Sequence, residues 1–310
     1  MPFHGWLMFL GTYSTVRRLC REQHFDAIDA HYIYPDVFAA VLLGKMVDLP
    51  VIASARGTDM NAFPQFRSIR PMIRWTLHRV RGAIGVCTPL LDSMLENGLT
   101  RDKGRVIGNG VDILRFYPVD RSEARRELNI PEDAQVVVSV GGLITRKGFH
   151  LLIPAVAEIT PRFPKLRLYI VGEGPERANL QKMIDERGLQ ERAFLVGPQP
   201  NEALKSWYSA ANISCLASSR EGWPNVLLES MACGTPVVAN RVWGVPEVIT
   251  SAEVGLMTEP AIPSIAQALD LGLRRNWDRE LISDFARRRT WDVVASEVED
   301  FFTTRLAQRR

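Results

Sequence analysis

Short apolar runs alternate with longer amphipathic stretches along nearly the whole chain. The first third contains four runs with the length and composition of buried strands: FDAIDA, VIASA, GAIGV and RVIGN. Six more follow: VVVSVGG, LRLYIVG, AFLVG, ISCLA, TPVVA and VGLMT. Helical patterns such as PDVFAAVLLGKM and PERANLQKMIDERG lie between the strands. Unbroken apolar strands that alternate with helices predict an α/β fold whose parallel sheets are covered by helices on both faces.

The 310 residues are enough for two domains of ordinary size. The pattern changes at FYPVDR, between Phe116 and Arg121, where a strand and its loop end and a new helix, SEARRELNI, begins. We therefore predict a first domain over residues 1–118 and a second α/β domain over 119–285. A carboxyl-terminal helix over 286–310 is expected to pack back toward the first domain.

The composition, 46% hydrophobic and 24% charged, is that of a globular protein in water, and a net charge of +3 does not indicate a nucleic-acid partner. The cysteines are scattered without a Cys-x-x-Cys pair, which favours reduced thiols in the cytoplasm over a disulfide framework or a zinc site. No run reaches the ~18 apolar residues of a membrane span. The apolar opening lacks the basic start of a signal peptide.

A glycine-containing turn joins a strand to a helix in VVVSVGGLITRKGFHLLI. Gly141 and Gly142 follow the strand, and the helix is expected to begin near Gly148. Free backbone N–H groups and the helix dipole attract anions at such a turn, and Arg146 and Lys147 add positive charge at the same end. This arrangement suits a diphosphate, although an ordinary loop with two solvated bases would have the same sequence.

A second glycine turn follows the strand in LYIVGEGPERANL. Gly172 and Gly174 match the start of a dinucleotide-binding fingerprint, but Arg177 stands where its third glycine is required. A tight turn is therefore the better interpretation, with Glu173 and Gly174 able to border a nucleotide.

Two glutamates lie close together in REGWPNVLLES. ISCLA before it is a predicted strand, so Glu221 lies in a loop at a carboxyl end, where open α/β sheets bind ligands. Pro224 and Gly234 suit the start and the end of a helix that contains Glu229. Each carboxylate could accept two hydrogen bonds from a vicinal diol such as that of ribose or a hexose. The alternative is a capping box of Ser218 and Glu221, but glycine and proline would then interrupt the helix.

EGWPNVLLE followed by SMACGTPVVA resembles the E-x7-E signature of retaining glycosyltransferases with the GT-B fold, notably glycosyltransferase family 4. IGNGVDILRFYP, VGGLITRKGFHLLI, LYIVGEGPER and WGVPEVI match other family segments in the same order. The similarity extends from about Asp26 to Trp291. It implies two Rossmann-like domains with parallel sheets.

The resemblance also implies roles for single residues. Glu229 would hold the ribose hydroxyls of the donor, Glu221 would face its sugar, and Lys147 would neutralise the leaving diphosphate. The family usually has arginine where this chain has Gly142, and Arg146 could supply that charge instead. The donor site so implied further includes Gly141, Gly142, Gly172, Glu173, Gly222, Pro224, Asn225 and Val226. Backbone N–H groups near the last two would contact the diphosphate.

The first domain resembles the family at DAHYIYPDVFAA and ASARGTDMN. Arg56 and Asp59 follow a strand there and would face the cleft as contacts to the acceptor or the donor sugar. Arg56 stands where many relatives have histidine, so we assign no catalytic base. His31 and Asn109 are further cleft residues in this interpretation, although His31 could simply be satisfied by loop carbonyls.

The segment RSIRPMIRWTLHRVR spaces Arg67, Arg70 and Arg74 on one face of a predicted helix, with apolar residues between them. A solvated helix face has this pattern. The alternative is a surface for anionic lipid, at the inner face of the membrane, or for a phosphate-bearing acceptor.

Family members normally begin with a strand and a glycine-rich loop that faces the acceptor, and nothing before Asp26 resembles either. We therefore expect one or two βα units, of ~30 or more residues each, to be absent, so that the first domain is incomplete.

These observations predict a retaining glycosyltransferase that moves a sugar from a UDP- or GDP-type donor to a glycan or lipid-linked acceptor. No Asp-x-Asp motif is present to carry a divalent cation, so we expect no metal and no cofactor. Cationic side chains and a helix N-terminus would stabilise the leaving diphosphate instead. Two alternatives remain open: a related GT-B sugar-nucleotide epimerase, and a non-catalytic module that only binds the sugar nucleotide.

Overall fold

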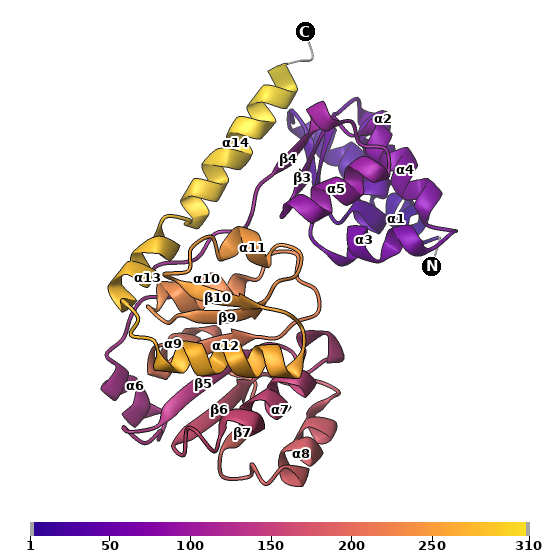
Figure 1. Cartoon of the computed structure of the whole chain (residues 1–310). Helices are drawn as coiled ribbons and strands as arrows, with labels where there is room; N and C mark the ends of the chain where they lie inside the picture. The colour runs from indigo at the N-terminus through magenta and orange to yellow at the C-terminus, as the bar shows by residue number, and fades with distance from the viewer. Residues whose placement is uncertain (1–2, 308–310) are drawn as a thin grey trace. The chain divides into compact units, whose positions relative to one another are not determined.

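The computed structural model describes residues 3–307, which form two compact units (Figure 1). Unit 2 comprises Gly110–Val293, and unit 1 comprises the residues before and after it. The boundary thus precedes the predicted one at residues 116–121. The reason is that Val111 and Phe116 are already buried in the core of unit 2.

Unit 1 is built on a parallel sheet of four strands in the order β1-β2-β3-β4, as the apolar runs predict. Its strands are β1 (Ile28–His31), β2 (Val51–Ala55), β3 (Gly82–Gly85) and β4 (Gly104–Val106). Its helices are α1 (His4–Glu22), η1 (Ile33–Val37), α2 (Phe38–Val47), α3 (Thr58–Asn61), η2 (Phe63–Gln65), α4 (Arg70–Arg79), α5 (Thr88–Glu96) and η3 (Arg101–Lys103). Every residue of β2 is buried, because helices cover both faces of a parallel sheet.

The last helix, α14 (Trp291–Ala307), starts in unit 2 and continues into unit 1. Within unit 1, Val294 and Phe301 pack in one apolar cluster with Ile52, Ile84 and Ile107. The segment before it, at 286–290, belongs to unit 2, where Thr290 forms a parallel bridge with Val111.

Unit 2 contains a parallel sheet of six strands. They are β5 (Gln135–Val140), β6 (Leu166–Val171), β7 (Ala193–Gly197), β8 (Ile213–Leu216), β9 (Val237–Asn240) and β10 (Gly255–Thr258). The connecting helices are α6 (Arg121–Glu127), η4 (Thr145–Lys147), α7 (Phe149–Ile159), α8 (Arg177–Glu186), η5 (Asn201–Ala203), α9 (Leu204–Ala210), α10 (Asn225–Ala232), α11 (Val245–Val248), α12 (Ile262–Arg274) and α13 (Arg279–Arg287). Each strand coincides with a predicted apolar run.

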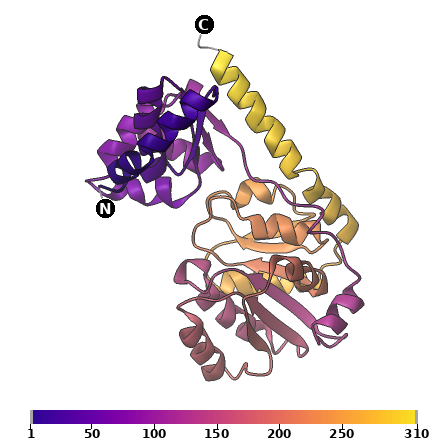
Figure 2. The same cartoon turned by 180° about the vertical axis from the view of Figure 1, so that it is seen from behind.

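The helices of unit 2 form a layer on each face of its sheet (Figure 1), and the same layers are seen from behind in Figure 2. Val136 and Val138 of β5 belong to one buried cluster, together with residues of α9, α10 and α13. Val137, between them, belongs to a second cluster with residues of α7 and α12. Successive strand residues point to opposite faces, so a strand covered on both sides must be apolar throughout.

The strand order of unit 2 is β10-β9-β8-β5-β6-β7. The chain therefore passes from β5 through β6 to β7, at one edge of the sheet. It then returns to β8, which lies on the other side of β5, and continues through β9 to β10 at the other edge. Val137 of β5 pairs with both Leu168 of β6 and Ile213 of β8. The loops after β5 and β8 thus leave the same sheet edge at the point where the order reverses, which is where open α/β sheets bind ligands.

The two glycine turns, after β5 and after β6, lie backbone against backbone. Gly141 N–H donates to the Val171 carbonyl at 3.0 Å, and Leu143 N–H donates to the Glu173 carbonyl at 2.9 Å. Gly172 has φ +149°, and a Cβ atom there would lie 2.0 Å from the Gly141 carbonyl oxygen. The close approach of the two turns therefore requires glycine at 172.

We expect Gly172→Ala to lower the free energy of unfolding by about 3 kcal/mol, because the added methyl group displaces backbone that cannot yield. Gly142→Ala is the matched control in the same pair of loops, since the nearest atom to its Cβ would be 3.8 Å away. The control should change stability by less than about 0.5 kcal/mol. Urea unfolding followed by circular dichroism measures both, and equal losses would refute the packing argument.

Candidate functional site

A buried ion pair joins the loops that follow β5 and β8. The Nζ of Lys147, in η4, lies 2.7 Å from Oε1 of Glu221, and the Glu221 side chain is only 9% exposed. Ser218 is fully buried and donates its hydroxyl to the same carboxylate oxygen at 2.6 Å. The two residues predicted to act on the sugar and on the diphosphate therefore meet at the reversal of strand order.

Arg146 adds a second cation beside this pair. Its Nη1 lies 3.7 Å from the other carboxylate oxygen of Glu221, and it donates to the Arg220 carbonyl at 2.9 Å. The Arg146 side chain is 41% exposed, whereas that of Lys147 is 17% exposed. Two cations and one carboxylate leave this corner with one net positive charge, which favours an anionic ligand.

The Glu221 loop is held from the neighbouring strand as well. Asn240, at the end of β9, donates its amide to the carbonyls of Ala217 at 2.7 Å and Ser218 at 3.2 Å. The Ser218–Glu221 contact joins two side chains in a loop, and Glu221 does not start a helix. The capping-box alternative is therefore wrong.

Glu229 has different surroundings, in the second turn of α10. The hydroxyl of Tyr208, which is fully buried in α9, donates to Oε2 of Glu229 at 3.0 Å. Burial raises the pKa of Glu229, while the Tyr208 hydrogen bond and the charge of Arg115 oppose that rise. The same burial, together with the nearby Glu229 charge, raises the pKa of Tyr208 well above its usual value. Tyr208 therefore stays a hydrogen-bond donor and orients the carboxylate.

The start of α10 lies between the two glutamates, as predicted. Pro224 precedes the helix, and Asn225 and Val226 form its first turn. The Asn225 N–H donates to the Trp223 carbonyl at 3.1 Å, so this amide is engaged within the loop. Gly222 is partly exposed in the same loop.

The backbone of the glycine turn after β5 lies beside the Lys147 side chain. A Cβ atom on Gly141 would contact the Lys147 side chain at 3.4 Å, so Gly141 lies along the stem of that lysine. Gly142 and Glu173 are exposed, and the Glu173 carboxylate pairs with Arg177 at 3.2 Å. Arg177, which replaces the third glycine of a dinucleotide fingerprint, therefore has a structural partner.

Unit 1 contains a chain of polar side chains at the carboxyl ends of β1 and β2. Arg56 donates through Nε to Nδ1 of His31 at 2.9 Å and through Nη1 to Oδ1 of Asn109 at 3.3 Å. Because arginine has only donors, Nδ1 of His31 must accept, and Nε2 is left to donate to Asp29 at 3.0 Å. Three of the predicted cleft residues are thus brought together. His31 is satisfied by side chains rather than by loop carbonyls.

Burial lowers the pKa of Arg56, and the charges of Asp29 and Asp59 oppose this. A guanidinium remains protonated under any ordinary condition. Arg56 therefore serves this group of side chains as a fixed positive donor and not as a base.

Asp59 is not presented to a ligand, and the prediction that it faces the cleft is wrong. It is fully buried, and its carboxylate accepts from the N–H groups of Ile33 at 2.9 Å, Gly57 at 2.8 Å and Arg56 at 3.2 Å. Burial raises its pKa, and these backbone hydrogen bonds oppose the rise. Asp59 fastens the loop after β2 to the chain that follows β1.

The arginine-rich segment also differs from its prediction. Helix α4 begins at Arg70, so Arg67 lies in the preceding turn and not on the same helical face. The proline at 71 explains this, because proline is favoured in the first turn of a helix. Arg70 and Arg74 are both exposed.

Over residues 3–307, no cluster of three or more histidine, cysteine or carboxylate side chains could hold a metal ion. Within the same residues, no helix is both long enough and apolar enough to cross a membrane.

Three supporting residues were not singled out from the sequence as parts of the site: Ser218 as a partner of Glu221, Tyr208, and Asn240. Ser218 stood three positions before Glu221, a spacing that was assigned to a capping box. Tyr208 and Asn240 belong to other elements, and only the packing of α9 and β9 against the site reveals them.

Comparison with known proteins relates both units to sugar-transferring enzymes. The family model described as glycosyl transferases group 1 matches residues 120–289, and the model described as glycosyltransferase family 4 matches residues 1–115. The D-inositol 3-phosphate glycosyltransferase of Acidothermus cellulolyticus is 34% identical over 228 residues, which cover 69% of this chain and 50% of the relative. The chain thus spans about half the length of that relative.

The N-acetyl-alpha-D-glucosaminyl L-malate synthase of Bacillus anthracis is 23% identical over 289 residues, or 92% of this chain and 74% of the relative. The crystal structure of Anabaena HepE in complex with UDP is similar with a TM-score of 0.83 and 20% identity, covering 94% of this chain and 81% of that one. This likeness shows the fold, and the predicted GT-B architecture is confirmed.

For Asp59, we expect Asp59→Ala to lower the free energy of unfolding by about 3 kcal/mol, because buried N–H groups lose their acceptor. Asp59→Asn should cost less, since its amide oxygen can still accept. Chemical unfolding of the three proteins provides the measurement. If the alanine variant were as stable as the parent, Asp59 would not be the fastening that its contacts indicate.

Proposed function

Since the chain belongs to the glycosyl transferases group 1 family, we propose that it moves a sugar from a nucleoside diphosphate sugar to a glycan or lipid-linked acceptor. We propose further that the configuration at the anomeric carbon is retained, and that neither a metal ion nor a cofactor takes part. The Lys147–Glu221 pair at the reversal of strand order is the observation that carries this proposal.

Lys147 and Arg146 are the groups proposed to receive the diphosphate. Departure of a nucleoside diphosphate places negative charge on the leaving oxygen, and fixed cations near that oxygen lower the barrier. Lys147 is positioned for this by its bond to Glu221, so little reorganisation of its side chain is needed. Arg146 is more exposed and can turn toward the ligand.

Glu221 is proposed to contact the donor sugar. A carboxylate without a cationic partner would repel a neighbouring diphosphate. Here Lys147 and Arg146 both lie within 4 Å of the Glu221 carboxylate and offset its charge. The carboxylate can then accept hydroxyl groups of the sugar while the cations bind phosphate oxygens.

Glu229 is proposed to hold the two ribose hydroxyls. Tyr208 fills one position on Oε2 and leaves the remaining lone pairs of the carboxylate for a diol. UDP is the first nucleotide to test, because the similar HepE structure was solved with UDP.

On the acceptor side, the Asp29–His31–Arg56–Asn109 chain offers polar groups suited to a polyhydroxylated or phosphorylated molecule. The D-inositol 3-phosphate named in the Acidothermus relative has both kinds of group, which supports testing such acceptors. We propose that the enzyme acts in the cytoplasm, which is consistent with four cysteines, all within residues 3–307, that form no disulfide.

To test the donor site, we expect Lys147→Ala to weaken UDP binding about tenfold and to slow sugar transfer about a hundredfold or more, because one preorganised cation is lost. Calorimetry with UDP and GDP measures binding, and release of UDP from a panel of UDP-sugars measures turnover with and without acceptors.

Lys165→Ala is the matched control for that variant. Lys165 also forms a lysine–carboxylate pair, 2.6 Å from Asp133, but it precedes β6 at the opposite sheet edge and is 61% exposed. The proposal fails if both variants behave alike, or if neither UDP nor GDP binds the parent protein. Binding without turnover on any donor would instead favour a non-catalytic module, and a changed sugar nucleotide released without acceptor would favour an epimerase.

For Glu229, we expect UDP affinity to fall as the pH drops through the raised pKa of this residue, because only the ionised carboxylate accepts both ribose hydroxyls. The decline should therefore begin at a higher pH than for an ordinary glutamate. Glu229→Gln removes this component while the titration of UDP itself is unchanged, and 2′-deoxy-UDP should show little of it. Isothermal titration over a pH series provides the data.

Tyr208→Phe sharpens that measurement. The Tyr208 hydrogen bond opposes the rise in the Glu229 pKa. Loss of this bond should therefore move the fall in UDP affinity to still higher pH. An unchanged pH profile in both variants would rule out Glu229 as the ribose-binding group.

A further inference from the structure

Trp243 has a backbone conformation that disfavours a large side chain. It lies in the loop after β9, where the Val242 carbonyl accepts from the Val245 N–H at 3.0 Å and closes a turn. Trp243 is the first central residue of this turn, and its φ of +45° is in the left-handed region. Glycine, asparagine and aspartate dominate such positions, and a bulky residue is an outlier there. Gly244, which follows, has φ −75°, a value open to any residue. The turn therefore has tryptophan where its backbone favours glycine.

Unit 2 provides no aromatic, cationic or hydrogen-bonding partner for this side chain among the described residues. Trp243 is partly exposed and belongs to neither apolar cluster of the unit, whereas the adjacent Val242 packs against one of them. The indole N–H groups of Trp207 and Trp223 are buried without an acceptor, but that of Trp243 is not among the buried groups. The Trp243 N–H is therefore open to solvent and free to donate.

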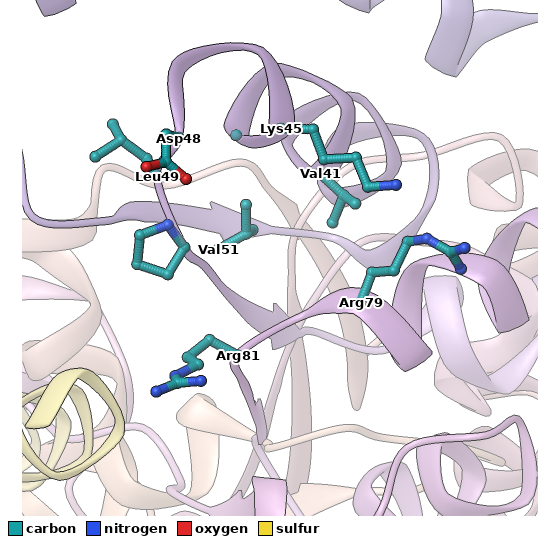
Figure 3. Close-up of a pocket in the computed structure, with 9 residues that line it drawn as sticks. Val41, Lys45, Asp48, Leu49, Val51, Arg79 and Arg81 are labelled. Atoms are coloured by element: carbon teal, nitrogen blue, oxygen red, sulfur yellow. The ribbon is translucent and has the colours of Figure 1, made fainter. Parts of the chain in front are cut away.

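Trp75 of unit 1 shows, by contrast, a tryptophan whose neighbours explain its position. The ring of Phe38 packs against it with centroids 5.4 Å apart. Lys45 and Arg79 lie over the Trp75 ring, 5.1 Å and 4.5 Å from its centroid. Figure 3 shows these two cations on the same side of a pocket of about 260 Å³ that they help to line. Trp243 has no comparable contacts, so packing does not account for it.

The Trp243 turn is attached to the loop that carries Glu221. The Gly244 N–H donates to the Glu221 carbonyl at 3.3 Å. Asn240, at the end of β9, donates its amide to two carbonyls of the same loop at 2.7 Å and 3.2 Å. Because β8 and β9 are parallel neighbours, both loops leave the carboxyl edge of the sheet, where such folds bind ligands. Trp243 is thus held beside the loop of the carboxylate proposed to contact the donor sugar.

We propose that Trp243 is a specificity-determining residue that covers one face of the donor sugar. A pyranose has hydroxyl groups around its rim and C–H groups on its faces. Glu221 would accept hydroxyls at the rim, and the indole ring would pack on a face while its N–H donates to a hydroxyl. Backbone strain that the fold does not require is typical of ligand-binding sites. This inference rests on the donor site proposed above, and it favours hexopyranoses whose C–H groups gather on one face.

Trp243→Asn tests the inference, because asparagine tolerates the left-handed backbone and removes the ring. We expect affinity for the bare nucleotide, UDP or GDP, to stay within about twofold of the parent value, and kcat/KM with the preferred nucleotide sugar to fall about tenfold. The melting temperature should stay within about 2 °C of the parent or rise, since strain is relieved. Trp243→Phe keeps a ring and should retain most of the kcat/KM. Calorimetry, nucleotide release from a panel of donors and circular dichroism provide these values.

Trp277→Asn is the matched control. Trp277 is also a partly exposed tryptophan of unit 2, but its indole N–H donates to the Gly272 carbonyl at 2.8 Å, and Arg275 lies over its ring at 4.3 Å. Loss of these contacts should lower the melting temperature by several degrees and leave kcat/KM unchanged. The two variants should therefore show opposite patterns.

The inference is overturned if Trp243→Asn keeps the parent kcat/KM, if it weakens binding of the bare nucleotide and of the nucleotide sugar equally, or if only the KM of an acceptor rises. It is also overturned if the melting temperature falls as far as in the control, since the ring would then be a packing residue. A parent protein that binds neither UDP nor GDP refutes the donor site, and this inference with it. Any of the other results with nucleotide binding intact refutes the role of the ring alone.

Discussion

The pairing of β5 with β8 is the constraint on which the arrangement of unit 2 depends. From β5 the strands continue through β6 to β7 at one edge of the sheet, and from β8 they continue through β9 to β10 at the other edge. The loops that follow β5 and β8 therefore begin side by side. Lys147 comes from one loop and Glu221 from the other, 74 positions apart in the chain. Without this pairing, the lysine would have no carboxylate and the buried glutamate no cation.

The two glutamates differ because their supports differ. Glu221 is held by a lysine and a serine, and the lysine balances its charge, whereas Glu229 is held by a neutral tyrosine and its burial raises its pKa. One loop and the helix after it thus provide a carboxylate paired with cations and a second carboxylate whose pKa is raised by burial. That contrast is consistent with separate tasks for the two residues.

The central strands of both sheets were predictable, because a strand buried on both faces is apolar at nearly all successive positions, as VVVSV and VIASA are. Their order was not, since hydrophobicity says whether a strand is buried but not which strand lies beside it. Motif spacing located Lys147, Glu221 and Glu229. Asp59 was misjudged because a carboxylate that binds backbone N–H groups looks the same in sequence as one that awaits a ligand. Tyr208 had no local signal, since its partner lies in another helix.

Gly142 has a broader consequence for how this site can vary. It lies in a backbone conformation open to any residue, with nothing closer than 3.8 Å to an added Cβ atom. The adjoining turn, by contrast, admits only glycine at 172. The loop therefore combines a fixed frame with a position where side-chain charge can be gained or lost in a single step. A substitution at position 142 can thus redistribute cations around this loop without a change in its backbone.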